Sequence, residues 1–300
     1  MSNNQKLQEI QDLLRNKNIK NNEFFTTYRM FVEDVNPFST CEKEQEELKK
    51  LSKDLWYFTF NLVKIQQVGT KDLASYKLNR QNLAVLYLLK NNLSVYTNSC
   101  RASYNTTTRI CYYLWRLVND PKYQFRILST NINSSIYTFR KMEFVNEQLP
   151  SCLRVKDLRK RVRLMSTINA DKARIKDLFG EDTTDILIQD FEHIGNIGNV
   201  MKVLNPLIEK EGLRVDCVST IGKNGSVGKI IGDKVIMDSY RWFEEMYDIE
   251  NLNRVFENKI IYVKYDYRDL FPEPDCWYYK ISECYNNNKS SLDREINLIR

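Results

Sequence analysis

The chain has 300 residues and a net charge of +6, with 42% hydrophobic and 28% charged residues. This composition is typical of a globular protein with one large domain, or one domain and a smaller appendage. No apolar run approaches the roughly 20 residues that cross a bilayer, and the charged stretch Met1–Arg15 is unlike a signal peptide, so no membrane association is expected. Seven scattered cysteines without metal-ligand spacing and a single histidine, His193, argue against a disulfide framework and a histidine-based site.

The first 53 residues predict an N-terminal helical segment. Leucine and isoleucine recur at helical spacing in residues 6–17, and residues 41–55 predict a second, charged helix with its leucines on one face. The aromatic cluster at residues 56–60 is more typical of core packing than of a ligand platform. We therefore expect a helical segment over residues 1–53, followed by a larger domain over residues 54–300.

After residue 76, short apolar strands alternate with helices. We predict helices over 82–89, 106–117, 135–148, 201–211, 238–247 and 277–285, and strands over 93–96, 125–129, 185–189, 214–218 and 259–265. This alternation indicates an α/β fold with a mostly parallel sheet flanked by helices. In such folds ligands bind beyond the carboxyl ends of the strands, here the loops 97–106, 130–134, 189–194 and 218–228.

The stretch Ser99–Trp115 has the order of a phosphate-binding loop: a strand, a polar turn and then a helix whose free N–H groups face an anion. That motif ends in Gly-Lys-Ser or Gly-Lys-Thr, whereas this chain has Tyr104, Asn105 and Thr106. The hydroxyl that would bind magnesium is kept, and the lysine that would reach the outer phosphates is replaced. Taken alone, the segment also fits a strand, turn and helix whose threonines only cap the helix.

Together with two later segments, this loop resembles the ATPase domain of viral large terminase subunits, the motors that pump double-stranded DNA into phage heads. The similarity is greatest to the large-phage and crAss-like members, covers residues 54–300 and rests on order and spacing. Arg101, Cys111 and Trp115 keep their family places around the loop. The resemblance implies a P-loop NTPase fold of the ASCE class. It also implies a nucleotide site, whose candidate residues are Ser103, Asn105, Thr106 and Thr107 at the phosphates, Gln81 at the base and Arg101 at the developing charge.

The second segment is Ile186–Ile194, which resembles the family strand that ends in Asp-Glu. In this register Gln189 replaces the acid that holds the magnesium shell, and Asp190 replaces the glutamate that orients the attacking water. Asp190 is therefore the expected catalytic carboxylate and, with Thr106, the expected metal ligand. Glu192 is expected to be a surface carboxylate.

The third segment is Cys217–Thr220 with the glycine-rich loop 222–228, which resembles the family's coupling motif. The resemblance implies that Ser219 and Thr220 sense the γ-phosphate and that Thr220 relays its loss. A lysine of this loop, Lys223 or Lys229, is a candidate replacement for the charge missing at Asn105.

The function implied by the resemblance is a motor that uses ATP and Mg²⁺ to move double-stranded DNA. It implies a homo-oligomeric ring in the host cytoplasm, working with a portal protein and a small terminase subunit. Family members continue into a nuclease domain, so the nuclease is expected to be absent here or on a separate chain.

Two other readings stay open. A catalytically inactive pseudo-ATPase acting as a structural or DNA-binding subunit is the first, because the charges lost at Asn105 and Gln189 are those that phosphoryl transfer needs most. The second is an unrelated helicase-like protein, although no helicase arginine motif is visible. The basic block Arg154–Arg163 is either a phosphate-tracking surface or a solvated face.

Overall fold

The computed structural model describes residues 40–66, 72–76, 80–90, 92, 94–100, 103–166, 183–195, 200, 204, 213–220, 236–238, 260–265 and 274–297. The larger of its two sheets has seven strands in the order β5-β4-β6-β7-β3-β9-β8, and every neighbouring pair is parallel. The strands are β3 (Ser94–Ser99), β4 (Phe125–Ser129), β5 (Val162–Ser166), β6 (Asp185–Gln189), β7 (Arg214–Ser219), β8 (Ile236–Asp238) and β9 (Ile260–Tyr265). The predicted α/β fold with a parallel sheet flanked by helices is confirmed.

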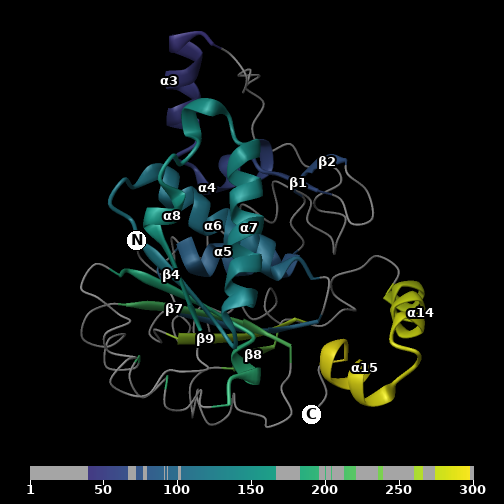
Figure 1. The fold of residues 1–300 in the computed structure, drawn as a ribbon. Coiled ribbons are helices and arrows are strands. Elements are labelled where there is room, and N and C mark those ends of the chain that lie inside the picture. The colour runs from purple at the N-terminus through teal and green to yellow at the C-terminus, as the bar shows by residue number, and fades with distance from the viewer. Residues whose placement is uncertain are drawn as a thin grey trace, which may run out of the picture.

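Three helices, α5 (Arg80–Lys90), α6 (Asn105–Asn119) and α7 (Ile132–Gln148), lie over one face of this sheet (Figure 1). The second sheet is an antiparallel pair, β1 (Lys64–Gln66) and β2 (Leu73–Ser75). The remaining helical elements are α3 (Glu42–Leu51), α4 (Leu55–Tyr57), η2 (Phe58–Leu62), η3 (Ser151–Leu153), α8 (Leu158–Arg161), η4 (Phe191–His193), α14 (Pro274–Cys284) and α15 (Lys289–Glu295).

The hydrophobic core forms between the sheet and helix α6. The side chains of Cys111 and Leu114 on α6 are fully buried, and the ring of Tyr113 stacks on Phe125 of β4 with centroids 4.4 Å apart. All five residues of β6 are buried as well, as expected for a central parallel strand covered on both faces. Burial of each such apolar side chain contributes about 1.5–3 kcal/mol, so β6 and α6 are held firmly in place.

The N-terminal part of the described chain packs against the same core. The aromatic cluster predicted to be core is buried at Trp56, Tyr57 and Phe58. Leu48 of α3 belongs to the same buried cluster as the residues of α6, and α3 is the described part of the predicted N-terminal helical segment. The helix predicted at residues 6–17 lies outside the described residues, and the division at residue 53 stays a prediction.

Several element boundaries differ from the predictions. The strand predicted at 93–96 extends to Ser99, and that at 214–218 extends to Ser219, so residues 97–99 and 219 belong to strands instead of loops. The helix predicted over 238–247 is wrong at its first residue, because Asp238 ends β8. Strand β5 was not predicted, because its basic residues hide the apolar pattern. Most of the helix predicted at 201–211 lies outside the described residues, where Leu204 is helical.

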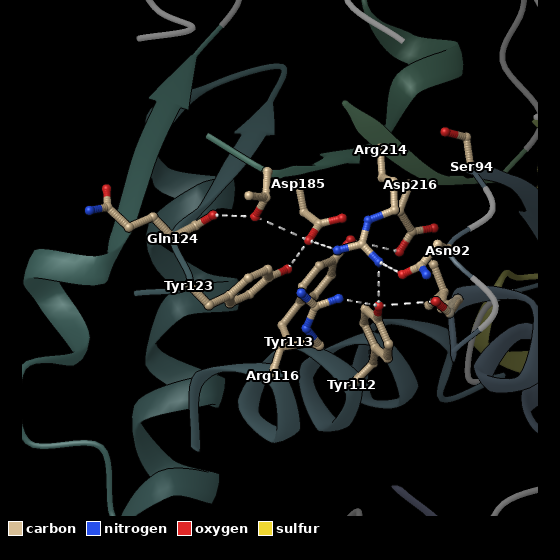
Figure 2. A network of polar contacts seen from close by, with 12 residues as sticks. Asn92, Ser94, Tyr112, Tyr113, Arg116, Tyr123, Gln124, Asp185, Arg214 and Asp216 are labelled. Atoms are coloured by element: carbon tan, nitrogen blue, oxygen red, sulfur yellow. Dashed lines mark hydrogen bonds and ion pairs between the residues drawn. The ribbon is translucent and has the colours of Figure 1, made fainter. Parts of the chain in front are cut away.

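The amino ends of β6 and β7 carry a buried polar network (Figure 2). Arg214, the first residue of β7, forms an ion pair with Asp185, the first residue of β6. Its guanidinium also donates to the Tyr112 hydroxyl at 2.9 Å and to Asn92 Oδ1 at 2.5 Å, while the Tyr123 hydroxyl donates to Asp185. Helix α6 is thereby attached to the sheet at the edge opposite to the predicted ligand loops.

Candidate functional site

Three of the predicted site segments meet at the carboxyl edge of the sheet. Strands β6, β7 and β3 are consecutive neighbours and run parallel, so the residues that follow them gather at one edge. Asn98 near the end of β3 is the register partner of Ser219 at the end of β7. The amide of Asp190, just after β6, donates to the carbonyl of Val218 at 2.8 Å. The structure thus brings together Ser103–Thr107, Asp190–His193 and Ser219–Thr220.

Tyr104 occupies the place of the motif's second glycine and keeps a glycine-like backbone. Its φ of 57° and ψ of 17° lie in the left-handed region, which costs a residue with a side chain about 1–2 kcal/mol. Its ring is 40% exposed and lies beside the ring of Tyr76, with centroids 6.4 Å apart. A left-handed turn therefore precedes α6 although the residue there is a tyrosine, whose ring is partly exposed.

The loop before α6 is held from outside by residues of the segment Tyr76–Asn82. Asn82 Nδ2 on α5 donates to the carbonyl of Ser103 at 2.9 Å. The Tyr76 hydroxyl and Thr108 Oγ1 lie 2.6 Å apart, and Thr108 Oγ1 donates to the Tyr104 carbonyl at 3.0 Å. Tyr76 and Asn82, which flank the predicted base contact Gln81 in the sequence, thus support the loop itself. The side chain of Gln81 lies outside the described residues.

Asn105, at the lysine position, points into the protein instead of into solvent. Its side chain is buried, and its Oδ1 accepts a hydrogen bond from Nη1 of Arg109, one helical turn further along α6. Because a guanidinium only donates, it turns the amide oxygen toward itself and the amide nitrogen away. That nitrogen, Nδ2, has no hydrogen-bond partner among the described residues.

Arg109 is the centre of a buried network that sequence reasoning missed. It is fully buried, its Nε donates to Asp216 Oδ1 at 3.0 Å, and its Nη2 donates to Thr97 Oγ1 at 2.6 Å. Burial raises the pKa of Asp216 to about 6 against the opposing pull of Arg109. At neutral pH the pair is therefore ionised. Its members Thr97, Arg109 and Asp216 come from three different elements of the chain, and no local sequence pattern marks them as partners.

Thr106 and Thr107 have the exposure that a ligand site needs. Both lie in the first turn of α6 and are half-buried, and neither hydroxyl bonds to any described residue. The first N–H groups of a helix have no partner within it and carry its positive dipole end. The start of α6 therefore offers hydroxyls and backbone donors to an anion.

At the end of β6 the substituted residue is also bound internally. Gln189 is buried, and its Oε1 accepts a hydrogen bond of 2.5 Å from Thr138 Oγ1 on α7. Asp190 follows in the left-handed region, with φ of 53° and ψ of 36°, and its side chain is exposed. The exposed carboxylate thus comes from Asp190, while Gln189 binds α7.

Glu192 is buried, so the prediction of a surface carboxylate is wrong. Its side chain is 3% exposed, and its Oε1 accepts a hydrogen bond from Asn98 Nδ2 at 3.1 Å. The 3-10 helix η4 causes this, because it turns the chain back across the end of β7 toward β3. Asn98 Oδ1 and Ser219 Oγ are buried atoms with no hydrogen-bond partner within the described part of the chain.

Thr220 lies at the same edge, with its Oγ1 3.1 Å from Nε2 of His193. The pair joins the residue after β7 to the turn after β6. Arg101, the glycine-rich loop 222–228 and the lysines Lys223 and Lys229 lie outside the described residues.

Within the described residues, no group of three or more His, Cys, Asp or Glu side chains has the arrangement of a metal site. A magnesium ion bound together with phosphates needs only one or two protein ligands, which Thr106 and Asp190 fit as a hydroxyl and an exposed carboxylate. The described helices also include none with the length and apolar character needed to cross a membrane.

No protein-family model matches the sequence, and no curated protein matches it. Among solved structures, the large terminase ATPase domain of Thermus phage P74-26 is similar with a TM-score of 0.51 and 12% identity, over 75% of this chain and 94% of that domain. The large terminase of bacteriophage HK97 gives a TM-score of 0.52 and 12% identity, over 82% of this chain and 54% of that protein. At this identity the similarity establishes the fold, which is that of large terminase ATPase domains.

Proposed function

We propose that this chain is the ATPase domain of a large terminase subunit that packages double-stranded DNA into a viral capsid. One observation carries the proposal. The fold is similar to that of terminase ATPase domains. At the carboxyl edge of its sheet lie the left-handed turn at Tyr104, the hydroxyls of Thr106 and Thr107, and the carboxylates that follow β6. This is the edge at which parallel α/β folds bind their ligands.

The nucleotide site follows from the start of α6. Thr106 would hold Mg²⁺ through its hydroxyl and Asp190 through its exposed carboxylate, and the ion would supply positive charge at the phosphates. Ser103, Thr107 and the free backbone N–H groups of the first turn bind the phosphates. Asn105 contributes its Nδ2, which Arg109 has turned away from itself. In this proposal Gln81 contacts the base and Arg101 stabilises charge on the γ-phosphate.

The reaction is attack of water on the γ-phosphorus in line with the departing ADP oxygen, whose bond to phosphorus breaks. A carboxylate after β6 takes the proton of the attacking water. Ser219 and Thr220 sense the γ-phosphate, and the contact of Thr220 with His193 links the two loops that must respond to its release.

Double-stranded DNA is the proposed partner of the basic block 154–163. Lys156 and Arg163 are exposed and form no ion pair with a described residue, whereas Arg159 and Lys160 are paired with Glu143 and Asp157. Arg161 is structural, because it donates to the backbone carbonyls of Leu117, Asp120 and Tyr123. We propose that the chain works in a homo-oligomeric ring in the host cytoplasm, with a portal protein and a small terminase subunit as partners.

A second candidate function is a catalytically inactive pseudo-ATPase that serves as a structural or DNA-binding subunit. The observation in its favour is that both substituted amides bind inside the protein, Asn105 to Arg109 and Gln189 to Thr138. Neutral amides held in this way replace the two charges that act by electrostatic stabilisation.

Titration of the full chain with a fluorescent ATP analogue and Mg²⁺, followed by phosphate release with double-stranded DNA, tests both functions. We expect Thr106→Ala to weaken magnesium-dependent ATP binding about tenfold or more, because it removes a metal ligand. Thr184→Ala is the matched control, since Thr184 is exposed at the opposite edge of the sheet. Binding of DNA without phosphate release favours the pseudo-ATPase, and absence of nucleotide binding contradicts the motor.

A further inference from the structure

Three buried polar side chains, Glu192, Asn98 and Ser219, lie at the carboxyl edge of the sheet, in η4 and at the ends of β3 and β7. Moving a carboxylate out of water is costly unless it is bound by donors, and Asn98 Nδ2 donates to Glu192. Buried polar atoms nearly always have partners, yet Asn98 Oδ1 and Ser219 Oγ have none within the described residues. These two atoms could therefore bond to a small polar ligand that comes next to the carboxylate.

The cluster lies on the sheet face that α6 does not cover. Thr97 meets Arg109 of α6, and successive side chains of a strand point to opposite faces, so Asn98 points to the other face. Phe191, next to Glu192, packs on that face, with its ring 6.0 Å from the ring of Tyr96. Glu192 therefore approaches the end of β3 from the side opposite to the first turn of α6.

This position matches the requirement of in-line attack. In the proposed function, the phosphates of ATP rest on the first turn of α6, so the bond to ADP breaks on that side. The attacking water must then enter from the opposite side of the γ-phosphorus. The carboxylate of Glu192 and the unpartnered oxygens of Asn98 and Ser219 lie on that other face. Asn98 is the next-to-last residue of β3, and Ser219 is the last residue of β7. A water that reached these three groups would have three polar partners, which is enough to order it.

We propose that Glu192 is the catalytic carboxylate that activates the attacking water, with Asn98 as its positioning residue; the inference rests on the proposed ATPase function. Glu192 accepts a proton from water as the water oxygen bonds to the γ-phosphorus and the bond to the ADP oxygen breaks. The proton then leaves with the phosphate product. Asp190, whose side chain is exposed, serves the magnesium ion and not the water.

The test compares Glu192→Gln with Asp190→Asn in the full chain, by ATP-analogue binding and by phosphate release over a range of Mg²⁺ concentrations. We expect Glu192→Gln to lower kcat about 100-fold or more, the usual contribution of a general base. Its affinity for the ATP analogue should stay within about threefold, because ground-state binding is untouched. Asp190→Asn should regain activity as Mg²⁺ is raised, and Glu192→Gln should not.

Glu192→Asp separates a catalytic role from a structural one. This variant keeps the charge but withdraws the carboxylate by one methylene, so kcat should fall while the melting temperature is retained. A wild-type kcat in Glu192→Asp or Glu192→Gln overturns the assignment to Glu192 alone. A wild-type chain that binds the analogue but releases no phosphate refutes the proposed motor function, and the catalytic role of Glu192 with it.

Discussion

The two edges of the seven-stranded sheet are built in opposite ways. At the amino edge, Arg214 and Asp185 form an ion pair whose remaining hydrogen bonds are taken by Tyr112, Tyr123 and Asn92 (Figure 2). At the carboxyl edge, two residues that are not glycine, Tyr104 and Asp190, have a left-handed backbone. Three buried side chains there have polar atoms without a hydrogen-bond partner among the described residues: Asn98, Asn105 and Ser219.

The difference separates a region that stabilises the fold from the region in which we propose that the nucleotide binds. Burial raises the pKa of Asp185, and the positive charge of Arg214 opposes that rise. The buried carboxylate at the amino edge therefore depends on its ion pair with Arg214. Strained backbone and unpartnered polar groups cluster where proteins bind ligands. Because β6 and β7 belong to both edges, the paired charges at one end hold the strands that position Asp190 and Ser219 at the other.

The largest expected effect comes from breaking the amino edge. Arg214→Met leaves the buried carboxylate of Asp185 without its counter-charge, which should lower the free energy of unfolding by about 3–5 kcal/mol. Urea denaturation measures the change. Arg159→Met is the matched control, because it removes an exposed ion pair with Glu143 and should have no measurable effect. Equal losses in the two variants would contradict the comparison.

A second prediction concerns Asp216, which lies in β7 between the two edges. Its pKa is about 6 in the folded protein against 3.8 as the ordinary value, so the folded state binds this proton more tightly than the unfolded state. Its contribution to stability is therefore full below about pH 4 and is lost as the pH rises to 6, by about 3 kcal/mol.

Unfolding free energies of the wild type and Asp216→Asn between pH 4 and 8 test this sign. The stability of the wild type relative to the variant should decrease from pH 4 to about pH 6 and stay level above it. Parallel curves for the two proteins would show that Asp216 has an ordinary pKa and that the network with Arg109 differs from the one described.

The smallest effect is expected at the strained turn. Tyr104→Gly relieves the left-handed conformation but gives the unfolded chain more freedom, so the net gain in unfolding free energy should be about 0.5–1 kcal/mol. Tyr104→Ala removes the same ring and keeps the strain, so it should give no gain. Equal stability of the two variants, measured by denaturation, would show that the turn is not strained.

The sequence by itself determined the local elements and the place of the loop. The strands at 125–129 and 185–189 have the predicted bounds, and α6 begins one residue before its predicted start. These features follow from short-range patterns, because burial of one face of a helix or of both faces of a central strand requires apolar residues at a fixed period. The places of Thr106 and Asp190 in the fold were predictable for the same reason, because each residue follows a strand that a local apolar run defines.

Only the tertiary structure decided which polar groups are partners. Arg109 pairs with Asp216, and Glu192 accepts from Asn98, although the members of each pair are 107 and 94 residues apart. These contacts depend on the strand order β6-β7-β3, which no local pattern encodes. The burial of Glu192, which was predicted to be exposed, has the same physical cause. Whether this side chain is exposed depends on the elements that pack against it, and the pattern of its own sequence segment does not show which elements those are.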